Sequence, residues 1–194
     1  NVCSSDLLVY GGANMTLSAT DVEMSVDAFI GADFVVAQLE VPFEAIEQAF
    51  KIARKQNITT VLNPAPAIEL PKSLLELTDI IIPNETEAEL LTGISINNES
   101  DMKETATYFL DLGISAVLIT LGEQGTYCAY QEQYKMIPAC NVKAIDTTAA
   151  GDTFIGAFLS ELNKDLSNLE SAIRLANQAS SLTVQRKGAQ ASIP

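Results

Sequence analysis

The sequence predicts an α/β fold in which helices cover both faces of a mostly parallel sheet. Short apolar runs of strand length alternate along the chain with longer segments of helical period. Several of these runs, such as FVVAQL at residues 34–39, are almost wholly apolar, as expected for strands buried on both faces. The chain has 194 residues, of which 47% are hydrophobic, enough for one domain with a sizeable core.

The N-terminal half is expected to supply the first strands of this sheet. Apolar runs predict strands over residues 7–10, 33–39, 58–62 and 79–82. Apolar side chains at helical spacing predict helices over residues 16–32, 42–56 and 73–77. Ser18 or Thr20 would cap the first helix, and Pro42 suits the first turn of the second.

The C-terminal half continues the same alternation. Helices are expected over residues 85–91, 100–112 and 166–184, and Gly93 and Gly113 would end the first two. A strand is expected over residues 116–120, followed by an antiparallel pair over residues 126–130 and 134–138. The chain contains no internal repeat and no linker, so we expect a single domain.

The most informative stretch is AIDTTAAGDTFIGAF at residues 144–158. A turn of small residues precedes Asp152, which we expect to open an apolar-periodic helix. Amides at a helix N-terminus attract anions, so Ala149, Ala150 and Gly151 would form an anion hole. A carboxylate beside such a turn suits proton transfer during phosphoryl transfer to an alcohol. Alternatively, Asp152 stabilises the helix N-terminus and the small residues serve packing.

Composition excludes several classes of function. Eleven Lys and Arg against 25 Asp and Glu give a net charge of −14, so a nucleic-acid partner is not expected. No run approaches the roughly 18 apolar residues of a membrane helix. Because histidine is absent, Ser-His and Cys-His pairs and histidine metal sites are excluded, and a general base must be another side chain. Three cysteines without CxxC spacing indicate reduced thiols and a cytoplasmic protein.

Polar residues stand where predicted strands end. They are Glu40, Asn63, Asn84, Thr120 and Asp146. Open α/β sheets bind ligands beyond the carboxyl ends of their strands. Each residue taken alone could be a turn former, but five along one edge favour a site.

Five motifs resemble those of the ribokinase-like (PfkB) carbohydrate kinases and occur in the order found in that family. They are NPAPA at residues 63–67, PNETEAELLTG at 83–93, ITLGEQG at 119–125, DTTAAGDTFIGAF at 146–158 and RKGAQASIP at 186–194. The resemblance covers the chain from about residue 8 onward. It implies the three-layer, Rossmann-like ribokinase fold and transfer of the γ-phosphoryl group of ATP to the 5-hydroxyl of D-ribose, with Asp152 as the catalytic base.

The resemblance also implies a set of binding residues. Glu40 and Asp152 would bind the sugar, and Asn84 and Glu87 would help to hold Mg²⁺ and phosphates, largely through water. The residues expected at ATP are Asn84, Thr120, Leu121, Gly122, Glu123, Gln124, Gly125, Gly151, Asp152 and Asn177. Those expected around a monovalent cation, usually K⁺, are Asp146, Thr148, Thr183, Arg186, Gly188 and Ser192.

Several of these residues have a structural alternative. Acidic residues after Pro83 would stabilise a helix dipole, and residues 120–125 would form a glycine turn. Asn177 would have a buried packing role, and Asp146 would form an Asx turn. The sequence has no GxxxxGK[ST] motif, which excludes a Walker-type phosphate loop.

Two alternative functions follow from the same residues. One is another kinase of this family, acting on deoxyribose, fructose or a nucleoside. The other is a non-catalytic nucleotide-binding module, although a binding protein has no chemical reason to keep Asp146, Gly151 and Asp152 together.

The resemblance further implies that the chain is incomplete. Residues 1–7 resemble a translated sequencing adaptor and are interpreted as non-native, with a native fragment boundary as the alternative. Residues 8–194 are interpreted as the C-terminal two thirds of a kinase domain. Family members carry roughly a hundred further residues before this point, which include sugar contacts and a β-sheet lid. We therefore expect a homodimer of the full-length protein, formed through that lid, and no kinase activity of the 194 residues alone.

Overall fold

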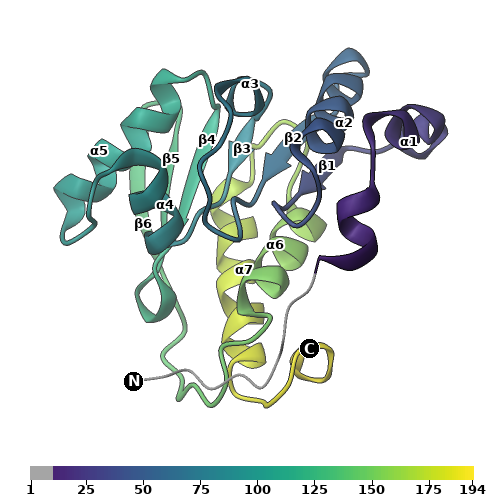
Figure 1. The fold of residues 1–194 in the computed structure, drawn as a ribbon. Coiled ribbons are helices and arrows are strands. Elements are labelled where there is room, and N and C mark those ends of the chain that lie inside the picture. The colour runs from purple at the N-terminus through teal and green to yellow at the C-terminus, as the bar shows by residue number, and fades with distance from the viewer. Residues whose placement is uncertain (1–10) are drawn as a thin grey trace.

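Six strands form one sheet in the order β1-β2-β3-β4-β5-β6 (Figure 1). The computed structural model describes residues 11–194, so the strand expected over residues 7–10 and the segment 1–7 lie outside the described residues. The strands are β1 (Phe34–Ala37), β2 (Thr59–Leu62), β3 (Ile80–Ile81), β4 (Ala116–Thr120), β5 (Gly125–Tyr130) and β6 (Gln133–Pro138). Neighbours from β1 to β4 pair in parallel, and β5 pairs antiparallel with both β4 and β6. The mostly parallel sheet is confirmed.

Helices cover both faces of this sheet, which confirms the three-layer arrangement (Figure 1). One face carries α2 (Phe43–Lys55), α3 (Lys72–Leu75), α4 (Glu85–Thr92) and α5 (Glu99–Asp111). On the other face α6 (Ala150–Glu161) and α7 (Leu169–Thr183) pack side by side. Within residues 11–194, none of the helices combines the length and apolar character needed to span a bilayer.

Alternate residues of the strands enter two separate cores, as the two-residue period of a strand requires. In β2, Leu62 belongs to the cluster that contains Phe50 of α2 and Phe109 of α5. Its neighbour Val61 belongs to the opposite cluster, with Phe158 of α6. The central strands are therefore buried on both faces, which explains the almost wholly apolar sequences of β3 and β4.

The prediction of one long helix over residues 16–32 is wrong. The segment instead forms the short helix α1 (Ala19–Met24) between 3₁₀ turns at Gly12–Thr16 and Val26–Phe29. No residue of these three elements is buried. A helix gains most of its stability from packing an apolar face, so this segment has little to hold it in one continuous helix.

Hydroxyl groups mark both ends of α1. Ser18 is the N-cap, as expected, and forms a capping box in which its Oγ accepts from the N–H of Asp21 and Asp21 accepts from the N–H of Ser18. At the other end Ser25 donates its hydroxyl to the carbonyl of Asp21 at 2.9 Å. Such side-chain bonds compete with helix continuation, and the α-helix stops there.

The two helices on the second face begin at other residues than expected. α6 begins at Ala150, two residues before Asp152, because Ala149 has a φ of 61° and turns the chain into the helix. α7 begins at Leu169 instead of residue 166, because Leu166 also has a left-handed φ, of 59°. Asp152 is consequently the third residue of its helix instead of the first.

Gly125, at the start of β5, is expected to be essential to the fold. Its φ is 110°, and a Cβ added there would lie 2.2 Å from the carbonyl oxygen of Ile137 on β6. The substitution Gly125→Ala should therefore lower the free energy of unfolding by about 2 kcal/mol or more, measured by urea denaturation. Gly156→Ala is the control: it lies within α6 with open space around it, and should stabilise by about 0.5–1 kcal/mol. Equal effects of the two substitutions would contradict this account.

Candidate active site

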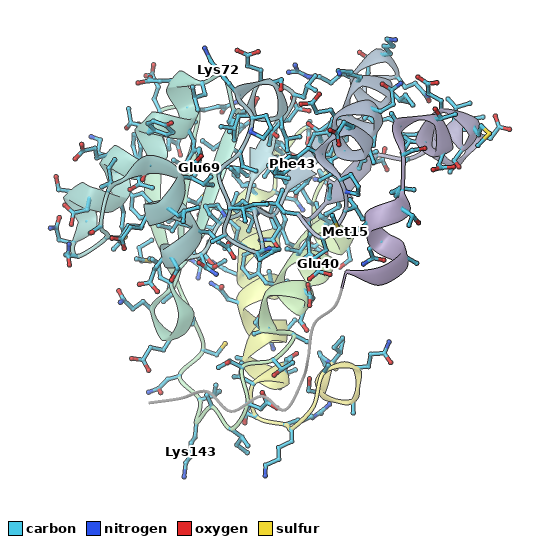
Figure 2. The ribbon with its side chains drawn as sticks, viewed as in Figure 1. Met15, Glu40, Phe43, Glu69, Lys72 and Lys143 are labelled. Carbon is cyan, nitrogen blue, oxygen red and sulfur yellow. The ribbon has the colours of Figure 1, made fainter. Side chains whose placement is uncertain are left out.

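The parallel strands end at one edge of the sheet, and the polar residues that follow them lie there together. Asn63 directly follows β2, and Asn84 forms a parallel bridge with Thr120 at the end of β4. Glu40 lies in the exposed turn after β1. Figure 2 shows its side chain near the middle of the molecule, below β1 and toward α6. The expectation that strand ends share one edge is confirmed for these four residues. It is wrong for Asp146, because residues 141–147 form no strand.

Asp152 lies at this edge and is exposed. Its Oδ1 accepts a hydrogen bond from Nε2 of Gln38, with 3.0 Å between the two atoms. Gln38 directly follows β1, so this bond joins the first turn of α6 to the carboxyl end of β1. The carboxylate therefore lies at the surface and not in the packed interior. At the surface it can reach a bound molecule.

The backbone around the start of α6 offers N–H groups to an anion. Among the described residues no partner is found for the N–H groups of Ala149, Gly151 and Asp152. The N–H of Ala150 instead donates to the carbonyl of Thr147 at 3.2 Å. Unpaired amides at a helix N-terminus carry partial positive charge. Of the three residues predicted for an anion hole, Ala150 is the one whose amide is already engaged.

Gln38 is a residue of this site that the sequence analysis missed. Its Nε2 donates to Oδ1 of Asn63 at 2.9 Å as well as to Asp152. Asn63 in turn donates from Nδ2 to the carbonyl of Ile82 at 2.8 Å. The available signal was a glutamine inside the apolar run FVVAQL, two residues before Glu40. Asn63 was recognised as a strand end, but its bond to Gln38 depends on the pairing of β1 with β2.

Asn84 and Glu87, predicted to lie near Mg²⁺, form a capping box at the start of α4. Oδ1 of Asn84 accepts from the N–H of Glu87 at 2.9 Å, and Oε2 of Glu87 accepts from the N–H of Asn84 at 2.8 Å. Oε1 of Glu87 accepts from Nδ2 of Asn84 at 2.9 Å. Burial raises the pKa of the Glu87 carboxyl, while the hydrogen bonds from Asn84 lower it. The pair thus stabilises the helix, and its association with Mg²⁺ stays a prediction.

The predicted nucleotide loop comprises residues 120–125: Thr120 ends β4, and the chain then makes a tight turn to Gly125 at the start of β5. Leu121 is buried, and its N–H donates to the carbonyl of Gly125 at 2.8 Å. Gly122, Glu123 and Gln124 between them are exposed. The two end residues therefore shape the turn, and the three middle residues are accessible to a ligand.

Asn177 on α7 has the buried packing role that the sequence left open. Its Nδ2 donates to the carbonyls of Ile137 and Pro138 at 3.0 and 3.3 Å. Its Oδ1 accepts from the hydroxyl of Thr126 at 2.8 Å. These bonds fasten α7 to β5 and β6 next to the nucleotide loop. A contact between Asn177 and ATP stays a prediction.

Asp146 joins the two loops that were predicted to enclose a cation. Its Oδ1 accepts from the N–H and the hydroxyl of Thr148 at 3.0 and 2.7 Å, which is the Asx-type turn left open above. Its Oδ2 accepts from the N–H of Gly188 at 3.0 Å. The bond from Gly188, those from Thr148 and the charge of Lys187 lower the pKa of Asp146 to about 2. A fixed negative charge therefore lies between the loops.

Thr183 and Ser192, also predicted for the cation site, are hydrogen-bonded to groups other than Asp146. The carbonyl of Thr183 accepts from the N–H of Arg186 at 3.0 Å, and the buried Ser192 donates its hydroxyl to a nearby carbonyl. Gly188 turns its N–H to Asp146. Among the described residues no hydrogen bond links Asp146 to Thr183, Arg186 or Ser192. The structure thus brings Asp146, Thr148 and Gly188 into contact, and a role for the other three stays a prediction.

An open recess of about 700 Å³ lies at the opposite edge of the sheet. Its lining includes Thr59, Asp79 and Ser115, which lie at the amino ends of β2, β3 and β4. None of the residues predicted from the sequence for substrate, nucleotide or ion lines it. The candidate site is therefore the carboxyl edge with Asp152.

Comparison with known sequences relates the chain to one group of enzymes. The chain is 64% identical over 188 residues to the ribokinase of Staphylococcus aureus (strain COL), covering 97% of this chain and 62% of that protein. It is 43% identical over 190 residues to the ribokinase of Haemophilus influenzae, covering 98% of this chain and 62% of that protein. The chain thus spans about 62% of the length of these two relatives.

Comparison with solved structures agrees with the sequence comparison. The structure of the Arabidopsis thaliana ribokinase complexed with ribose and ATP matches with a TM-score of 0.85 and 32% sequence identity, covering 96% of this chain and 61% of that one. The sequence profile described as pfkB family carbohydrate kinase matches residues 4–194. Since that profile covers nearly all of the sequence, the chain belongs to the pfkB family of carbohydrate kinases.

Proposed function

We propose that the full-length protein containing this chain phosphorylates D-ribose at the 5-hydroxyl with ATP. The observation that carries the proposal is the exposed carboxylate of Asp152, held by Gln38 next to the unpaired amides of Gly151 and Asp152. The identity with ribokinases supports ribose as the acceptor. The fold likeness to a ribokinase complexed with ribose and ATP supports both substrates.

In this reaction Asp152 acts as the general base. It takes the proton of the sugar hydroxyl while the hydroxyl oxygen attacks the γ-phosphorus and the bond from that phosphorus to ADP breaks. The N–H groups of Ala149, Gly151 and Asp152 stabilise the negative charge of the transferring phosphoryl group. Base and amides act on one reacting centre because they lie within one turn of the chain.

The substrates would occupy the carboxyl edge on either side of α6. Glu40 binds a sugar hydroxyl, because it is exposed in the turn that follows Gln38. ATP lies along the exposed residues Gly122, Glu123 and Gln124, with its phosphates toward α6. This arrangement orients the γ-phosphoryl group toward the sugar hydroxyl.

Mg²⁺ fits the Asn84–Glu87 pair through water. Both oxygens of Glu87 already accept hydrogen bonds and the side chain is buried, so direct coordination would disrupt the capping box. Mg²⁺ keeps several waters and needs few carboxylates, which agrees with such an indirect site. When bound, the ion neutralises charge on the phosphates of ATP.

A monovalent cation such as K⁺ fits the segment around Asp146. The lowered pKa of Asp146, about 2, favours an ionised carboxylate there, and the hydrogen bond from the N–H of Gly188 brings the two loops together. Thr148, Thr183, Arg186 and Gly188 would supply backbone oxygens, and Ser192 would support the second loop. The ion's chemistry is electrostatic: it offsets the charge of Asp146 and steadies the turn that carries the amides of α6. We also propose that the full-length enzyme is a cytoplasmic homodimer.

The substitution Asp152→Asn in the full-length enzyme should lower kcat by a factor on the order of 10² or more, because the base is lost while the shape is kept. The measurement is steady-state release of ADP with ribose as acceptor. Asp165→Asn is the control, because Asp165 is an exposed carboxylate that caps the turn at Ser167, away from the site. Near-normal turnover of the Asp152 variant would remove this residue from the role of base.

Replacing K⁺ by Na⁺ should reduce the activity of the full-length enzyme, because the smaller ion cannot span the same oxygens around Asp146. Activity is compared at constant ionic strength with chloride as the anion. Asp146→Asn should abolish the difference between the two ions. An enzyme indifferent to the ion would contradict the assignment of the cation loop.

Among ribose, deoxyribose, fructose and nucleosides, ribose should give the highest kcat/KM in a coupled assay of ADP release. The reason is that binding of the sugar hydroxyls by groups such as Glu40 distinguishes acceptors by hydrogen bonding. A higher kcat/KM for another sugar would reassign the substrate within the family. The absence of turnover with every acceptor would instead support a non-catalytic module.

A further inference from the structure

A chain of side-chain amides runs from β3 to Asp152, and its direction is set by a backbone carbonyl. The carbonyl of Ile82 can only accept a hydrogen bond, so Asn63 turns its Nδ2 toward it, at 2.8 Å. Oδ1 of Asn63 therefore faces Gln38. Asn63 is only 9% exposed, which keeps water from replacing these contacts.

The same order of donors and acceptors decides which atom of Gln38 faces the carboxylate of Asp152. Because Oδ1 of Asn63 is an acceptor, Gln38 must present Nε2 and not Oε1, at 2.9 Å. An amide nitrogen carries two hydrogens, and the second is donated to Oδ1 of Asp152 at 3.0 Å. This series of hydrogen-bonded amides therefore ends in a donor, Nε2 of Gln38, and the group that it meets must be an acceptor. An ionised carboxylate always provides one.

We propose that Gln38 is a positioning residue for Asp152, anchored by Asn63. It holds Oδ1 in place and leaves Oδ2 free to take the proton of the acceptor hydroxyl. The inference rests on the proposed function, in which Asp152 is the base. Gln38 acts through Asp152, and 114 positions of sequence separate the two residues. The bond also fixes the first turn of α6, with its free amides, against the carboxyl end of β1.

Other charged groups occur near this edge. They are Glu40 after β1, Asp146 before α6, and Arg186 and Lys187 after α7. Among the described residues, none of them forms an ion pair or a hydrogen bond with Asp152. Gln38 is therefore the side chain through which this structure controls the orientation of the carboxylate.

Two substitutions separate positioning from simple packing. Gln38→Leu removes the donor, and Gln38→Glu keeps the shape but replaces the donor by an acceptor that faces both Asn63 and Asp152. We expect kcat with ribose to fall on the order of 10-fold to 100-fold in the leucine variant, because a bond to a charged group is lost. The kcat of the glutamate variant should fall further, because the new carboxylate at position 38 and that of Asp152 then face each other. If Gln38 merely filled space, the glutamate variant would be close to wild type.

The split between kcat and KM gives a second readout that packing alone would not move. Gln38 acts through Asp152 and contacts no substrate in the proposed reaction, so both variants should lower kcat and leave the KM values for ribose and ATP nearly unchanged. A rise in KM that accounts for the whole loss of kcat/KM, with kcat unchanged, would overturn the proposal.

Gln48→Leu is the matched control, because Gln48 also donates from Nε2 to a carboxylate, Glu23, at 3.0 Å, on α2 away from the site. It should leave kcat and KM unchanged, and a loss equal to that of Gln38→Leu would overturn the proposal. A crystal structure of the Gln38→Leu variant needs no turnover, so it separates two failures. A reoriented Asp152 carboxylate in an enzyme without kinase activity contradicts the proposed function but supports the link between Gln38 and Asp152.

Discussion

The hydrogen bond between Gln38 and Asp152 joins the layer of α6 and α7 to the carboxyl edge of the sheet. Hydrophobic packing of α6 sets its distance from the sheet, but apolar contacts have no direction and do not orient a carboxylate. The polar chain through Asn63 to the carbonyl of Ile82 supplies that direction. The buried sheet thereby orients the carboxylate of Asp152, which is itself at the surface.

The three layers explain why chemistry gathers at this edge. Parallel pairing of β1 to β4 brings four strand ends together, and a polar residue lies at or within three positions of each end. The start of α6 adds unpaired amides and a carboxylate, and Asp146, whose pKa is lowered to about 2, adds a negative charge just before it. A phosphate-bearing ligand at this position meets partial positive charge from the backbone, although the whole chain carries a net charge of −14.

Much of the fold follows from the sequence because apolar runs and helical periodicity are local signals. The strands and the helices of both faces were predicted in this way, and Asp152 followed from the small-residue turn before it. The prediction of one helix over residues 16–32 failed because periodicity does not reveal that none of the apolar side chains of this segment becomes buried. Gln38 was missed for a different reason. Its partners Asn63 and Asp152 lie on other elements, and only the completed fold brings them together.

The central claim is that Asp152 accepts the proton of the sugar hydroxyl while Gln38 holds its other oxygen. The most direct test is a crystal structure of the full-length enzyme with ribose and a non-hydrolysable ATP analogue. The account predicts that Oδ2 of Asp152 lies within hydrogen-bond distance of the ribose 5-hydroxyl, with Oδ1 still bonded to Gln38. A 5-hydroxyl bonded to some other side chain, with Asp152 turned away from the sugar, would contradict it.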